Sequence, residues 1–142
     1  MKTSKDMLSS LLKTTQMGQV GIRSVRGAAT GAQMKQALDS QLREYNAIEK
    51  EAYAIAARRG WKLKELPAGA RSMANLMAHG SLGISPNDSR IAGMMIQGNT
   101  RGVIKSLKNL HRYSQNDGSV SVLSQKLLDC ENNNIRQMEN FL

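Results

Sequence analysis

KLLDCENNNIRQMENFL, residues 126–142, combines a helical apolar pattern with polar residues at positions where apolar ones are expected. At helical spacing one face of this segment, extended back by one turn, collects six side chains: Leu123, Leu127, Cys130, Asn134, Met138 and Phe141. Asn134 thus lies in the middle of an apolar face, and Glu131, three residues earlier, lies on nearly the same face. A buried polar pair costs free energy unless other groups hydrogen-bond to it. We therefore expect partners for this pair on the other helices.

The composition predicts an all-α protein. The 142 residues include two prolines, one tryptophan, one phenylalanine and nine methionines. Domains rich in strands use more β-branched and aromatic residues, whereas Leu, Ile, Met and Ala suit a helical core. The length fits a single domain, residues 1–142, that can bury a core without disulfides.

Hydrophobic spacing and turn residues predict an up-down bundle of four helices. Their expected ranges are about 4–29, 32–59, 86–113 and 119–141. The first two would form a hairpin, and Gly60 would end the second. Residues 61–86 carry both prolines and the only tryptophan, so we expect 61–85 to be a long crossover with one short helix around 70–79. Such a crossover lets the third long helix run parallel to the second.

Each expected long helix carries polar residues near its middle. They are Gln19 on the first, Gln41 and Glu44 on the second, Gln97 on the third, and Glu131 and Asn134 on the fourth. Two interpretations are open. The side chains can hydrogen-bond to one another and fix how the helices are rotated, or they can be the remains of a metal site. We favour the first.

Three segments resemble the uncharacterised ferritin-like proteins of spore-forming bacteria, which are similar in turn to some spore-coat proteins. These segments are REYNAIEKEA at 43–52, SRIAGMMIQGNTRGVIKSLKNL at 89–110 and the C-terminal stretch at 126–142. The resemblance implies a ferritin-like bundle, in which glutamates and Glu-x-x-His pairs hold two irons. Relatives tend to carry His and Glu where this chain has Arg90, Gly93 and Gln97, which implies a degenerate site.

Glu44 and Glu131 are the only carboxylates among the expected ligands, and two carboxylates cannot neutralise two ferrous ions. We therefore expect no cofactor, and a non-catalytic, structural or protein-interaction role. The alternative is an oxidoreductase-like protein that binds iron or manganese through the following residues: Glu44, Glu131, Gln41, Gln97, Asn134 and Gln19.

A second alternative is a basic bundle that binds nucleic acid. The formal net charge is +9, and residues 58–64 combine Arg58, Arg59, Lys62 and Lys64 with Trp61, an aromatic ring that can stack on a base. The same stretch also fits a helix C-terminus, where cations complement the helix dipole. Because the other charges are scattered along the helices, we favour a solvated exterior over a nucleic-acid surface.

The expected location is the cytoplasm, with association to the spore as an extension of the resemblance. Cys130 is the single cysteine, so it forms no internal disulfide. The chain has no long apolar run, and its first residues, MKTSKDMLSS, are too polar for a signal peptide. We expect no membrane insertion, and a protein partner or a second copy of the chain as the binding partner.

Overall fold

The computed structural model describes residues 3–70, 72, 87–112 and 117–142. Its long helices are α1 (Ser4–Arg26), α2 (Ala32–Arg59), α4 (Asp88–Arg112) and α5 (Gly118–Glu139), and no strand occurs in these ranges. The prediction of an all-α protein is confirmed. Within the described ranges, no helix has the length and apolar character that crossing a membrane requires.

The sequence places most helix ends within two residues of where the structure has them, because the ends are defined by local hydrogen bonds. Thr3 caps α1 in a capping box with Asp6, and Thr3 Oγ1 accepts from the Asp6 amide at 3.2 Å. Gly60 takes the left-handed conformation with φ 65°, which closes α2. The expected first helix, 4–29, is three residues too long, because Gly27 caps α1 and turn hydrogen bonds follow.

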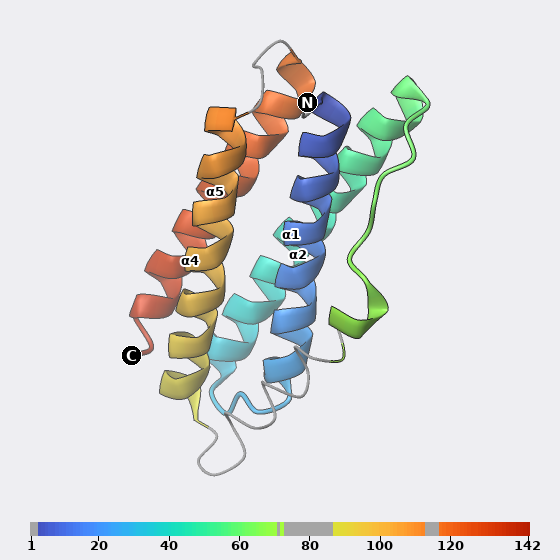
Figure 1. Ribbon diagram of the computed structural model, residues 1–142. Coiled ribbons are helices and arrows are strands. Elements are labelled where there is room, and N and C mark those ends of the chain that lie inside the picture. The colour runs from blue at the N-terminus through green and yellow to red at the C-terminus, as the bar shows by residue number, and fades with distance from the viewer. Residues whose placement is uncertain (1–2, 71, 73–86, 113–116) are drawn as a thin grey trace.

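Two side-chain contacts show how the helices are directed. At one end, the Asp88 carboxylate at the start of α4 accepts hydrogen bonds from the amides of Thr30 and Gly31, both at 2.9 Å. At the other end, Arg59 at the end of α2 pairs with Asp117 at the start of α5. The helices α2 and α4 therefore run in the same direction, as the predicted crossover requires, and α1 and α5 run against them (Figure 1).

The described part of the crossover, residues 61–70, returns along α1. The Lys64 amide donates to Ser9 Oγ at 3.1 Å, and the Leu66 amide donates to Gln16 Oε1 at 2.8 Å. Residues 68–70 and 72 are helical. The remainder of the short helix expected at 70–79 lies outside the described residues.

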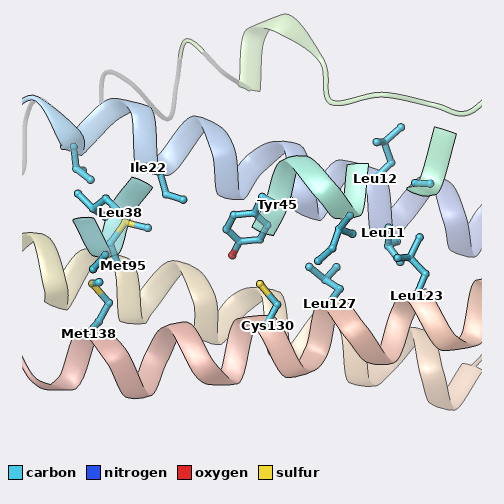
Figure 2. Packing of buried hydrophobic residues seen from close by; sticks show 14 of the residues in the cluster. Leu11, Leu12, Ile22, Leu38, Tyr45, Met95, Leu123, Leu127, Cys130 and Met138 are labelled. Atoms are coloured by element: carbon cyan, nitrogen blue, oxygen red, sulfur yellow. The ribbon is translucent and has the colours of Figure 1, made fainter. Parts of the chain in front are cut away.

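The core has two apolar regions separated by Tyr45 (Figure 2). Ile22, Leu38, Met95 and Met138 lie on one side of its ring, and the second region collects four leucines: Leu11, Leu12, Leu123 and Leu127. The ring stands in the middle of the helices, where the sequence places polar residues. The candidate site is therefore the layer around Tyr45.

Candidate functional site

Four buried polar side chains gather around the middle of the helices: Tyr45, Asn99, Glu131 and Asn134. We call them the polar cluster. Each is only 2–3% exposed, so the cluster belongs to the interior. Tyr45 comes from α2, Asn99 from α4, and Glu131 and Asn134 from α5. The placement of Glu131 and Asn134 on an inward face agrees with the apolar pattern of residues 126–142.

The shortest hydrogen bonds of the cluster are made by Asn99 of α4, and one of them joins α4 to α2. The Tyr45 hydroxyl donates to Asn99 Oδ1 at 2.9 Å, and Asn99 Nδ2 donates to the Met95 carbonyl oxygen at 2.7 Å. Asn134 Nδ2 lies 3.4 Å from Asn99 Oδ1 and 3.5 Å from the Tyr45 oxygen. These longer contacts are weaker, because hydrogen-bond energy falls with distance. Tyr45 and Asn99 therefore carry most of the hydrogen bonding.

Two glycines allow side chains of the cluster to pack closely against the backbone of neighbouring helices. A Cβ atom added at Gly18 of α1 would lie 2.5 Å from Tyr45 Cζ, and one added at Gly102 of α4 would lie 2.5 Å from Glu131 Oε1. The Tyr45 ring therefore packs directly on the backbone of α1, and the Glu131 carboxyl packs on that of α4. A methyl group at either position would force the Tyr45 ring or the Glu131 carboxyl to shift, so glycine permits both close approaches.

Burial changes the protonation of Glu131. Desolvation raises the pKa of its carboxyl to about 8, and the nearby Tyr45 hydroxyl only partly opposes this rise. Among the described residues, Glu131 Oε2 has no hydrogen-bond partner. Burial, together with the Glu131 charge, in turn raises the pKa of Tyr45. At neutral pH Glu131 is therefore mostly an uncharged acid.

Cys130 lies beside the cluster and faces α2. Its Sγ donates to the Glu44 carboxylate at 3.2 Å. Burial and this carboxylate both raise the pKa of the thiol. Since a thiolate is the reactive form of cysteine, these neighbours keep Cys130 unreactive.

Gln97 is expected from the sequence among the inward-facing polar residues at the middle of the helices. That expectation is wrong, because Asn99 is the residue of α4 that belongs to the polar cluster. The buried face of α4 contains Ile91, Met95 and Asn99, and a residue two positions from this face points away from it. Gln97 is accordingly exposed. Glu44 is also exposed, and only its contact with Cys130 connects it to the cluster.

Gln41 and Gln19, the two buried glutamines among the expected ligands, bond away from the cluster. Gln41 Nε2 donates to Gln137 Oε1 at 2.8 Å, and Gln19 Oε1 accepts from Arg23 at 3.5 Å. The expectation that the glutamines, Asn134 and the two glutamates satisfy one another is therefore wrong in detail. Tyr45 and Asn99 provide the main link in their place.

The residues present do not fit a di-iron centre. Of the six expected ligands, only Glu131 and Asn134 belong to the cluster, and Glu131 is the only carboxyl group in it. In the described part of the chain, no three His, Cys, Asp or Glu side chains come together in a way that could hold a metal ion. Iron and manganese prefer anionic oxygen and imidazole ligands, and this interior offers amides and a phenol.

The four cations of residues 58–64 do not form one common surface for an anionic partner. Its four cations are exposed, but Arg59 pairs with Asp117 and lies over the Trp61 ring, with its guanidinium carbon 5.1 Å from the ring centroid. Trp61 is half-buried against the core. These contacts favour the structural interpretation of Arg59 and Trp61. Lys64, in contrast, lines a groove that the sequence reasoning missed.

This groove lies between α1 and α4 and has a volume of about 530 Å³. Six cations line it: Lys13, Lys64, Arg101, Lys105, Lys108 and Arg112. We call it the basic groove. Four of its cations follow one face of α4 at positions i, i+4, i+7 and i+11. That spacing is the sequence signal that could have revealed the groove.

Comparison of the chain with protein-family models, with curated proteins and with solved structures gives no match. The resemblance to ferritin-like proteins of spore-forming bacteria therefore stays a prediction.

Proposed function

We propose that this chain is a ferritin-like four-helix bundle whose polar interior is structural, and that it works as a non-catalytic protein-interaction module. The observation that carries this proposal is the Tyr45–Asn99 hydrogen bond beside an uncharged Glu131. In a metal centre the same central positions would need ionised ligands. Here they hold neutral hydrogen-bonding groups.

The polar cluster can fix how the helices are rotated relative to one another. Tyr45 extends from α2 over Gly18 of α1 and reaches Asn99 of α4, while Asn134 approaches from α5. Rotation of α2, α4 or α5 would separate a buried polar group from its partner, which costs free energy. A single polar residue in a helical core can specify alignment in this way, at some loss of stability.

The chemistry of the cluster supports a non-catalytic role. A substrate would have to reach side chains that are at most 3% exposed. The acid beside them holds its proton at neutral pH, and the neighbouring thiol resists ionisation. The thiol is therefore not suited to act as a nucleophile.

The outer surface offers apolar side chains for an interaction. Leu107 on α4 is 39% exposed, and Val122 on α5 is 70% exposed. Apolar side chains of this size gain free energy when a partner covers them. In the proposed role, these helices contact a second copy or another protein.

Metal analysis tests the proposal. Protein purified without chelator is loaded anaerobically with ferrous or manganous ions, desalted and measured by mass spectrometry, beside a Glu44→Gln, Glu131→Gln variant. We expect far less than one metal per chain in both proteins. Near-stoichiometric metal in the wild type that disappears in the variant would overturn the proposal in favour of an iron- or manganese-binding protein. Circular dichroism confirms that the variant is folded.

Self-association is tested by sedimentation velocity over a range of concentrations. A dimer that dissociates on dilution, and that is weakened by Val122→Ser, supports interaction between copies. A monomer at every concentration would rule out self-association and leave another protein as the partner.

A further inference from the structure

The basic groove concentrates positive charge at one place on the surface. Its lining includes six cations and a single carboxylate, Asp6. Asp6 is engaged by the cap of α1, where its Oδ2 accepts from the Thr3 amide at 2.9 Å. The groove therefore has a large local excess of positive charge, which repels itself and weakens the folded state unless an anion binds there.

The register of the two helices brings these cations together. Figure 1 shows α1 and α4 side by side, and the two helices run in opposite directions. Asn109 Nδ2 donates to Ser10 Oγ at 2.9 Å, which pairs these positions across the groove. Three residues along α1, Lys13 comes close to the stretch of α4 between Lys105 and Lys108. Lys64 joins them because the crossover is held to Ser9.

The cations of the groove differ from those that stabilise the fold. Elsewhere in the described residues, Arg26 pairs with Asp39, Arg59 with Asp117 and Lys126 with Glu51. None of the six groove cations takes part in these ion pairs. Between them lie the neutral side chains of Ser9, Ser10 and Asn109, which can donate hydrogen bonds to oxygen atoms of a bound anion.

We propose that the basic groove binds the phosphate backbone of a nucleic-acid duplex. The α4 cations from Arg101 to Arg112 lie 11 helical steps apart at the extremes, which is about 16 Å. Along the axis of a DNA duplex, about 16 Å carries roughly five phosphates of one strand. A line of cations therefore faces a line of phosphates, and Lys13 and Lys64 add contacts from the opposite side.

The lining favours a duplex over a single strand or a membrane. No aromatic side chain is among the described residues that line the groove, so exposed bases would find no ring to stack on. Ile104 is the only large apolar side chain among them, whereas a helix that lies in a membrane surface needs a broad apolar face. The contacts would go to the backbone, and binding would not depend on base sequence.

Fluorescence anisotropy with a short labelled DNA duplex tests this site. Binding should weaken steeply between about 50 and 200 mM salt. If all six cations contact phosphates, a plot of the logarithm of the association constant against the logarithm of the salt concentration should have a slope of about −5. Arg101→Glu, Lys105→Glu should lower the affinity at least about tenfold and make the slope shallower by about 2. The milder variant Arg101→Gln, Lys105→Gln should also lower the affinity for the duplex and make the salt dependence shallower.

The matched control is Lys50→Glu, Arg136→Glu, which changes the net charge equally at exposed positions outside the groove. Its affinity should stay within about threefold of the wild type. Equal losses in both charge-reversed proteins, or no duplex binding at about 50 mM salt, would overturn the proposal. Stronger binding to single strands, or binding to phosphatidylserine vesicles without duplex binding, would overturn it as well. These outcomes concern the outer surface and leave the proposed role of the polar cluster unaffected.

Discussion

Replacing Glu131 by glutamine should stabilise the protein at alkaline pH and leave it nearly unchanged at acidic pH. Glutamine has the shape of glutamic acid and cannot ionise, so it preserves the packing on Gly102. The carboxyl of Glu131 has a pKa of about 8 in the folded chain, against the usual 4.5. Between these values the folded protein holds a proton that the unfolded chain has already released.

The sign and size of the effect follow from this linkage. Stability falls as the pH rises from about 4.5 to about 8, because the unfolded state then binds fewer protons than the folded state. At 1.36 kcal/mol per pKa unit, the full loss is about 5 kcal/mol above pH 8 and vanishes below pH 4.5. Because Glu131 is only 2% exposed, solvent does little to reduce this value.

Urea unfolding followed by circular dichroism at about pH 5, 7 and 9 measures the effect. The difference between Glu131→Gln and wild type should grow from near zero at pH 5 to several kcal/mol at pH 9, where the variant is the more stable protein. Glu44→Gln is the matched control, because Glu44 is an exposed carboxylate beside the same cluster. Parallel stability curves for the wild type and Glu131→Gln would refute the reasoning that burial keeps Glu131 protonated.

Five further substitutions test the hydrogen bonds, the packing and the α5 cap by the same urea assay. Asn99→Leu should cost about 2–3 kcal/mol because it removes the acceptor of a buried hydroxyl. Asn134→Leu, whose contacts are 3.4 Å or longer, should cost less than about 1 kcal/mol, and equal losses would contradict this ranking. Gly18→Ala should cost about 1–3 kcal/mol because its methyl group meets a tyrosine ring, whereas Gly21→Ala, with open space around it, should be neutral or stabilising. Asp117→Ala should cost about 1–2 kcal/mol at pH 7 through loss of the α5 cap, and the cost should disappear as the pH falls below 3.8, because the ion pair with an arginine lowers the pKa of this carboxyl.

The features that the sequence predicts correctly depend on local chemistry. Thr3 can cap a helix wherever its own backbone allows, and Gly60 can take a positive φ in any fold. The apolar periodicity of residues 126–142 likewise requires Asn134 to face inward once Leu127 and Met138 are buried. Local patterns of this kind predict the helical class and most of the helix ends. They also predict two of the four residues of the polar cluster, Glu131 and Asn134.

The partner of Asn134 on α4 could not be chosen from the sequence alone. Gln97 and Asn99 are both polar, lie two residues apart and flank the middle of the helix. Which one is buried depends on how α4 is rotated, and the burial of Ile91 and Met95 decides that rotation in favour of Asn99. The three glycines of this helix, Gly93, Gly98 and Gly102, add to the ambiguity because any of them could mark the close approach. Only Gly102 meets another side chain.

The basic groove is harder to foresee, because it belongs to no single segment. Residues 58–64 drew attention as the densest run of cations, yet Arg59 is used internally by Asp117 and Trp61. The groove instead collects cations from α1, the crossover and α4. Charges that look scattered along a chain can converge when helices of opposite direction pack at a fixed register, as the Ser10–Asn109 bond fixes it here. For a basic helical protein, the spacing of cations along each helix face is therefore more informative about an anionic partner than their density along the chain.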